Sequence, residues 1–471
     1  MAEVFKRSLE AHRWLGLLIS AAMYLICLSG TLLVFQEELT RWEQPNVTEM
    51  STLSAKEISG SFNTLFSDPA LQTPHLYVVL PTDAMPRARL ASETDSWYLN
   101  ADGSLGAQEQ NAWTQMLTDL HYYLHLPHTF GIMLVSACGA LLVGLIISGF
   151  MSHPKILRDA FKLRLGGNRQ LAQTDIHNRL SVWAAPFHLM IAITGAYFGF
   201  ALLLITVYDR TYGANDPTAA IDSVFGAEPT LEQAPSALRI DRALTQMTEL
   251  APEQTPIMVI VHDAGTPQQF IEVLATVEQR LIYSENYLFD ADGDYLSKQG
   301  FSDGDPGKQI IYSMYRVHFG RFGSFPVKLL YGLLGLALTI VSATGVNIWL
   351  AKRRHRNALD DLWAGIVWAC PPALALAAVL TMLGVGAAVI SFWVAYCVGI
   401  AAALWTRHPE TARRSLQWLT VMSLGVLAIT HSVIFDLSRL TLIVNGTLLA
   451  GAIIIAVLAM GATRASVEPS Q

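Results

Sequence analysis

The chain has 471 residues, of which 52% are hydrophobic and only 15% are charged, whereas a typical soluble domain carries about 25% charged residues. Long stretches carry almost no charge, and this pattern predicts an integral membrane protein with sizeable water-exposed domains. The net charge of −7 gives no sign of a basic nucleic-acid-binding surface. All four cysteines lie in apolar segments, so neither a disulfide framework nor a zinc site is indicated.

Eight stretches are long and apolar enough to cross a bilayer, which takes roughly 20 residues. The last four follow one another with very short connections, like two membrane hairpins appended to a four-helix unit. The predicted spans are Trp14–Phe35, Phe130–Met151, Leu180–Val207, Leu329–Leu350, Leu362–Met382, Ala387–Trp405, Leu416–Ile434 and Leu440–Met460.

The distribution of lysine and arginine predicts the orientation of these spans. With both termini in the cytoplasm, 17 of the 31 basic residues lie in short inner connections. The two long outer segments, 39–125 and 208–328, then hold 13 basic and 27 acidic residues. The predicted organisation is a first span in 1–38, an outer domain in 39–125, two spans in 126–207 with an inner loop at 152–179, a second outer domain in 208–325, a fourth span in 326–351, and four more spans in 352–471.

Each outer segment mixes helical patterns with short strand-like runs, which is typical of an α+β domain. Each also contains an Asp-Gly step between apolar runs, at Asp102-Gly103 and at Asp292-Gly293, and such a step favours a β-hairpin. The sequence therefore predicts a membrane protein of about eight helical spans with two α+β outer domains.

A Ser/Thr-Gly step recurs near one end of each of the first four spans, and histidines precede it at matched offsets. The interval from His12 to Gly30 is the same as the interval from His177 to Gly195. The interval from His121 to Gly149 is longer, and the interval from His318 to Gly345 differs from it by a single position. The matched offsets indicate a duplicated unit of helix, outer domain and helix, so that the first four spans form a duplicated four-helix core.

Paired histidines at one depth of a helical bundle are typical of b-type haem ligation, because neutral imidazole is a strong axial ligand. His12 with His177 would form an inner site, and His121 with His318 an outer site. The helical stretch from His12 to Gly30 spans about 27 Å, so a further group between the two sites is expected. His188 is the candidate, because it lies about three helical turns beyond His177 and shares its face on a continuous helix.

Other assignments of the histidines remain open at this stage. His125 lies one turn after His121 and could replace it, while His153 lies at the inner end of the second span. Any single histidine at the end of a span could instead be an interfacial residue that binds water or lipid headgroups.

The chain resembles the PepSY-associated transmembrane proteins, a family of bacterial inner-membrane proteins often linked to iron uptake. The resemblance covers residues 1–355 and leaves the last four spans outside. The matching motifs are Ala11–Gly16, Ser148-Gly149 with His153–Lys155, Asp175–Trp183 with Pro186–His188 and Thr194-Gly195, and Val317–Gly323.

The resemblance implies PepSY-like outer domains and a bacterial inner-membrane location. It also implies a reductase with two b-type haems, ligated through His12, His121, His177 and His318. Such a protein would pass electrons from a cytoplasmic or membrane donor to a ferric siderophore or another Fe(III) chelate in the periplasm. The alternatives are a membrane-anchored PepSY module that regulates a protease, and a transporter component. The scarcity of ionisable residues in the spans disfavours the transporter.

Overall fold

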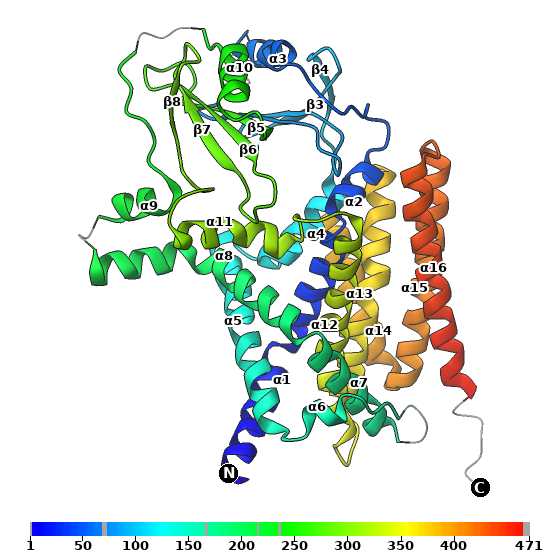
Figure 1. Cartoon of the computed structure of the whole chain (residues 1–471). Coiled ribbons are helices and arrows are strands. Elements are labelled where there is room, and N and C mark those ends of the chain that lie inside the picture. The colour runs from blue at the N-terminus through cyan, green and yellow to red at the C-terminus, as the bar shows by residue number, and fades with distance from the viewer. Residues whose placement is uncertain (1, 68–72, 165–167, 214–215, 234–236, 465–471) are drawn as a thin grey trace. The chain divides into compact units, whose positions relative to one another are not determined.

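The chain forms two compact units, seen here in a computed structural model that describes residues 2–67, 73–164, 168–213, 216–233 and 237–464. The helical unit comprises 1–45, 111–200 and 323–471, and the sheet unit comprises 46–110 and 201–322. Figure 1 shows the course of the chain through both.

The helical unit contains most of the long helices of the chain. Among the described residues, eight helices are long and apolar enough to cross a membrane, and they correspond to the eight predicted spans. These eight are α1 (Ala2–Leu33), α5 (His128–Ser152), α8 (Ala185–Tyr212), α12 (Phe325–Ala351), α13 (Ala358–Met382), α14 (Ala388–Thr406), α15 (Pro409–Ile434) and α16 (Arg439–Arg464). The prediction of a multi-pass membrane protein is therefore confirmed.

Shorter helices flank these spans: α2 (Gln36–Glu43), α4 (Ala112–Tyr123), α6 (Ile156–Asp159) and α7 (Arg169–Trp183). The predicted third span began at Leu180, but α7 ends at Trp183 and α8 begins at Ala185. The prediction of one continuous helix from His177 to His188 is therefore wrong. Pro186 explains the break, because proline has no N–H to donate and its ring clashes with the carbonyl of the preceding helical turn.

Two of the predicted ligands also lie on short helices rather than on the spans themselves. His121 lies in the last turn of α4, which ends at Leu124 in the left-handed conformation (φ 55°). His318 lies in the last turn of α11 (Pro306–Phe319), which ends at Gly320 (φ 66°). In both cases the helix ends before the next span begins, so a separate helix carries each histidine.

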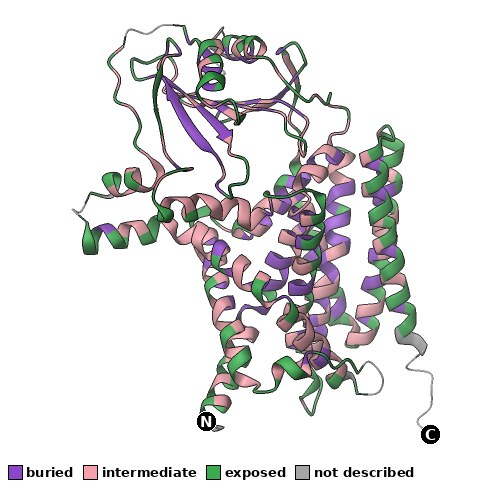
Figure 2. Ribbon diagram, viewed as in Figure 1, coloured by how far each residue is buried: buried purple, intermediate pink, exposed green. Residues whose placement is uncertain are grey.

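Of the four C-terminal helices, α14 and α15 pack against α13 and α16 packs against α15, while α13 also touches α1, α4 and α12. Buried residues are frequent along α13 (Figure 2). Side-chain hydrogen bonds tie α13 to the first helices: Tyr24 Oη donates to the Val367 carbonyl at 2.7 Å, and Trp113 Nε1 donates to the Leu374 carbonyl at 3.0 Å. Because these donors are buried, their hydrogen bonds hold α13 firmly against α1 and α4.

The sheet unit combines strands from both outer segments into one antiparallel sheet with the order β4-β3-β2-β1-β5-β6-β7-β8. Each segment supplies four consecutive strands, and β1 pairs with β5. The elements are α3 (Ala55–Ser67), β1 (Leu76–Val79), β2 (Arg89–Ala91), β3 (Ser96–Leu99), β4 (Leu105–Gln108), α9 (Pro217–Phe225), α10 (Ile240–Leu250), β5 (Thr255–His262), β6 (Phe270–Thr276), β7 (Glu285–Phe289), β8 (Tyr295–Lys298) and α11.

Both predicted Asp-Gly hairpins are present in this sheet. Gly103 lies between β3 and β4 and Gly293 between β7 and β8, and each has a φ of 78°, which glycine adopts without steric cost. The two segments were predicted as two outer domains, and the pairing of β1 with β5 joins them instead through a shared sheet. The apolar faces of α3 and α10 bury Phe62 and Met247 with the strands in a single core.

Candidate functional site

The rings of His12 and His177 lie close together in the helical unit. Their centroids are 6.4 Å apart and their planes are nearly perpendicular, at 85°. His12 comes from the first half of α1 and His177 from α7, so the pairing joins two segments that are far apart in the sequence. The predicted inner pair of histidines is thus brought together by the fold.

Each of these rings is held through its Nδ1 atom. His12 Nδ1–H donates to the Leu145 carbonyl at 3.0 Å, with Ser148 Oγ also within reach at 3.2 Å. His177 Nδ1 lies 3.1 Å from Thr344 Oγ1. The Thr344 hydroxyl donates its own proton to the Ile340 carbonyl at 2.8 Å, so it accepts the proton of Nδ1–H. Both rings are therefore fixed in the tautomer that leaves the Nε2 lone pair free for a metal.

The spacing of the two rings fits a metal bound between them. With a metal–nitrogen bond of about 2.0 Å and about 1.1 Å from nitrogen to ring centroid, two axial imidazoles have centroids about 6.2 Å apart. Burial, with a smaller contribution from His12, lowers the pKa of His177 to about 4, so this ring is neutral near pH 7, as a ligand must be. The residues present therefore fit an axially ligated haem iron.

Each of these histidines lies beside a glycine of another helix. A Cβ atom on Gly149 would lie 3.2 Å from His12 Cε1, and one on Gly345 would lie 3.5 Å from His177 Cε1. Small residues here allow close helix packing, as in many membrane bundles. In this protein the space beside each glycine is filled by an imidazole from a neighbouring helix, which the matched offsets in the sequence did not reveal.

Near the other end of α1, His121 also donates through Nδ1–H to a backbone carbonyl and lies beside a glycine. Its Nδ1–H donates to the Ile26 carbonyl at 2.8 Å, and a Cβ on Gly30 would lie only 2.6 Å from its Cε1. Ile26 lies one turn before Gly30, as Leu145 lies one turn before Gly149. Burial lowers the pKa of His121, which keeps this ring neutral as well. Along α1, His12 and Ile26 are separated by about 21 Å.

The predicted partner of His121 lies in the other unit. His318 belongs to α11 of the sheet unit, where its ring lies 5.5 Å from that of Phe319. The pairing of His121 with His318 therefore stays a prediction.

Both ring nitrogens of His125 are engaged in hydrogen bonds. Trp393 Nε1–H donates to His125 Nδ1 at 2.8 Å, and His125 Nε2–H donates to the Met116 carbonyl at 2.9 Å. Neither nitrogen retains a lone pair for a metal, so these contacts argue against His125 as a ligand.

The two remaining candidates occupy different surroundings. His188 is only 2% exposed, and its Nε2 lies 3.4 Å from the Leu334 carbonyl on α12. His153 is partly exposed and lies 3.3 Å from an oxygen of Asp159. His188 is therefore a buried polar group within the helical unit, whereas His153 makes a local contact with Asp159 near the end of α5.

The contacts of a second buried polar cluster, around His431, were not anticipated from the sequence. His431 Nε2–H donates to the Trp42 carbonyl at 2.8 Å, and the Trp42 ring stacks on it at 4.5 Å. Asn445 accepts from Trp42 Nε1 at 2.9 Å and contacts His431 Nδ1 at 3.3 Å. With both nitrogens engaged, His431 serves to join α2, α15 and α16.

Within the described residues, no group of three or more His, Cys, Asp or Glu side chains is arranged to hold a metal ion. A haem iron takes only axial ligands from the protein, so a pair of histidines is the relevant arrangement.

Comparison with known proteins places these features in a family. The model of the PepSY-associated TM region matches residues 9–352, which include α1 to α12 and end before α13. The chain is also 25% identical over 251 residues to an uncharacterised protein of Pseudomonas aeruginosa. That match covers 50% of this chain and 63% of the relative, which is less than two thirds of its length. Because the family match covers well over half of the chain, the protein belongs to the PepSY-associated transmembrane family.

Proposed function

We propose that the protein is a haem-bearing membrane oxidoreductase that passes electrons across the bilayer to a periplasmic ferric chelate. The arrangement of His12 and His177 carries the proposal, because both Nδ1 atoms are held and both Nε2 atoms are left for a metal at bis-imidazole spacing. Their separation of 6.4 Å fits an iron between them.

The roles of the chain's own residues follow from their contacts. His12 and His177 would hold one b-type haem, and His121 with His318 would hold a second. When bound, each haem supplies a reversible one-electron change at its iron. The hydrogen bonds to Leu145 and Thr344 orient the rings of the first pair and raise the basicity of their free nitrogens.

The distance between the two sites calls for an intermediate group. The His12 and His121 sites are separated by about 21 Å along α1. His188 contacts Leu334, which lies about 15 Å along α12 from Thr344. We propose that this buried imidazole lies on the route between the sites.

The proposed substrate is an Fe(III) chelate such as a siderophore. Reduction weakens the binding of iron by hard oxygen donors, because Fe(II) is less charged and softer. The two outer segments hold 27 acidic and 13 basic residues, so a neutral or cationic chelate is favoured over a strongly anionic one. This assignment places the protein in the bacterial inner membrane with both termini in the cytoplasm.

The visible spectrum of the detergent-purified protein, with and without dithionite, tests the proposal. The wild type should show a b-type Soret band and α-band. Both bands should be weaker in His177→Ala, because this variant loses the haem held between His12 and His177. His355→Ala is the matched control, because His355 is exposed in the loop after α12 and should leave the spectrum unchanged. A colourless protein from haem-replete cells would contradict the proposal and favour a protease-regulating PepSY module or a transporter.

Substrate reduction is tested separately from haem content. The dithionite-reduced protein, freed of excess reductant, should be reoxidised by a neutral or cationic ferric hydroxamate, and more slowly by a strongly anionic chelate. A coloured protein that no ferric chelate reoxidises would retain the haem assignment and refute the reductase assignment.

A further inference from the structure

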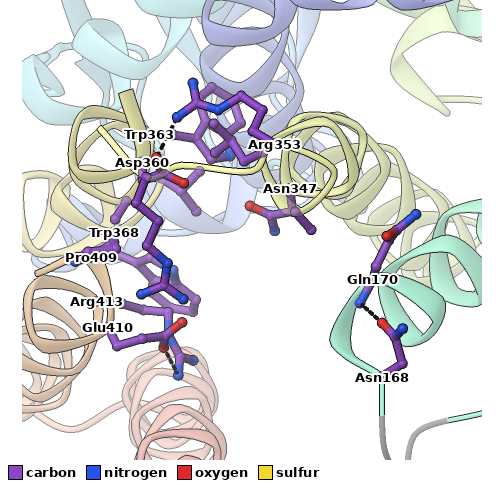
Figure 3. Close-up of a pocket in the computed structure, with 15 residues that line it drawn as sticks. Asn168, Gln170, Asn347, Arg353, Asp360, Trp363, Trp368, Pro409, Glu410 and Arg413 are labelled. Atoms are coloured by element: carbon purple, nitrogen blue, oxygen red, sulfur yellow. Dashed lines mark hydrogen bonds and ion pairs between the residues drawn. The ribbon is translucent and has the colours of Figure 1, made fainter. Parts of the chain in front are cut away.

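A cavity of about 390 Å³ opens within the helical unit between the first helices and the appended ones (Figure 3). Its walls come from the start of α7, the end of α12, the first half of α13 and the start of α15. Its volume lies within the range of about 300–1,000 Å³ that is usual for small-molecule sites. The sequence did not reveal it, because its walls are far apart along the chain.

Two residues that line the cavity carry buried hydrogen-bond donors that no described protein group satisfies. Trp363 is 7% exposed, and its Nε1–H has no acceptor among the described residues. Arg353 Nε, also buried, is likewise without an acceptor in the described part of the chain. A buried donor without a partner costs about 1–3 kcal/mol, so both groups favour a ligand that carries acceptor oxygens.

The charges of the lining argue against a highly anionic ligand. Arg353 pairs with Asp360 at 2.7 Å, and Arg413 pairs with Glu410 at 3.0 Å, as Figure 3 shows. Arg356 is the third lining arginine, so three cations face two carboxylates and the net charge is one positive. A nicotinamide or flavin dinucleotide carries at least two phosphate charges, which this lining does not match.

The lining also has apolar side chains and includes a residue close to the His177 site. Leu350, Val367 and Trp368 supply hydrocarbon and aromatic surface. Asn347 lines the cavity and donates to Gln173, one turn of α7 before His177. It lies beyond Thr344 by about 4.5 Å along α12. A ligand in this cavity would therefore lie beside the histidine pair.

We propose that this cavity binds the headgroup of a membrane quinol, the electron donor of the oxidoreductase proposed above, on which this inference rests. A quinol is neutral, flat and apolar, carries two oxygens that can accept hydrogen bonds, and reaches the protein from the bilayer. Trp363 and Arg353 would donate to one of its oxygens. Each quinol oxidised to a quinone releases two electrons and two protons, so that two Fe(III) chelates become two Fe(II) chelates and the protons pass to water.

The position of the cavity also gives the appended helices a role. Its walls combine α7 and α12 of the family-matched region with α13 and α15, which follow that region. The C-terminal helices would thus complete a donor site that the first four spans alone do not enclose.

Binding of tail-less quinones tests the inference without recourse to enzyme activity. The probes are menadione and 2,3-dimethoxy-5-methyl-1,4-benzoquinone, titrated by calorimetry into the full-length oxidised protein in detergent. Trp363→Phe keeps the ring but removes the N–H donor, and should weaken binding about five- to tenfold. Ala364→Phe fills the cavity from α13 and should abolish binding. Trp405→Phe is the matched control, because Trp405 is 88% exposed on α14. This variant should bind both quinones as the wild type does.

The outcomes separate this inference from the proposed function. Size-exclusion profiles and melting curves identify any variant that fails to fold. Trp363→Phe removes a donor and Ala364→Phe fills the cavity, so a single folded variant is enough to test the inference. Equal affinity in the wild type, Trp363→Phe and Ala364→Phe overturns the inference, as does displacement of the probe by NADH, by FMN or by anionic phospholipid. A haem-bearing wild type that binds neither quinone refutes the donor site alone, whereas a colourless protein refutes the oxidoreductase.

Discussion

Substitution of Gly30 by alanine tests whether the glycines of the Ser/Thr-Gly steps make room for histidines. The new Cβ would lie 2.6 Å from His121 Cε1 and 2.9 Å from its Nδ1. Carbon atoms in contact normally lie about 3.5–4.0 Å apart, so the ring must retreat by about 1 Å. The same movement would stretch the 2.8 Å hydrogen bond from His121 Nδ1 to the Ile26 carbonyl beyond hydrogen-bonding distance.

The matched control is Gly345→Ala, in which the new Cβ lies at an ordinary contact distance of 3.5 Å from His177 Cε1. Alanine is favoured over glycine in a helix by about 1 kcal/mol, and this gain applies to both variants. Overpacking costs about 1–3 kcal/mol and the lost hydrogen bond about 1 kcal/mol more, and these costs apply only to Gly30→Ala. Gly30→Ala should therefore lose about 1–3 kcal/mol of stability, whereas Gly345→Ala should be neutral or slightly stabilised.

Two measurements check this contrast. Thermal unfolding in detergent should show a lower melting temperature for Gly30→Ala than for the wild type and Gly345→Ala. The ratio of bound haem to protein should fall in Gly30→Ala, because the His121 site is distorted while the His12 site is intact. Equal melting temperatures and equal spectra in the two variants would refute the argument that Gly30 makes room for the imidazole.

Three further substitutions test the supporting contacts. Thr344→Val removes the hydroxyl that accepts from His177 Nδ1–H and should reduce haem affinity about tenfold or more. Ser148→Ala should have a smaller effect, because His12 still donates to the Leu145 carbonyl. Equal haem retention in the two variants, measured by titration, would contradict this. His125→Ala should lower the melting temperature, because the Trp393 indole loses its acceptor. It should leave the visible spectrum unchanged, and a lost haem band would make His125 the ligand. Asn445→Leu leaves Trp42 Nε1–H and His431 Nδ1 without a partner and should lower the free energy of unfolding by about 2–4 kcal/mol without altering the spectrum. Unchanged stability would show that the cluster around His431 is not structural.

The predictions that depended on local composition were confirmed. The eight spans are identifiable because a lipid-exposed helix needs a long apolar stretch whatever its neighbours are. The hairpins at Gly103 and Gly293 are identifiable because a tight turn with positive φ requires a particular residue at a particular place. The family is also evident from the sequence, because its motifs lie at fixed positions within these local elements.

The histidine repeat was detected in the sequence, but its geometry was not. The offsets paired His12 with His177, and the fold brings their rings to 6.4 Å from each other. They could not show that Gly30, Gly149 and Gly345 each lie beside a histidine of another helix, since a periodicity within one helix says nothing about its neighbour. The break at Ala184 also removed the argument that placed His177 and His188 on one face.

The choice between His121 and His125 depended on tertiary contacts alone. The two are one turn apart in sequence and chemically identical, so the motif leaves both open. The indole of Trp393, which comes from the distant helix α14, occupies the lone pair of His125 Nδ1 and so argues against His125 as a ligand. The sequence by itself determined that this is a membrane protein with paired histidines. The tertiary structure decided which ring nitrogens are free, because hydrogen-bond partners come from distant segments that only folding brings together.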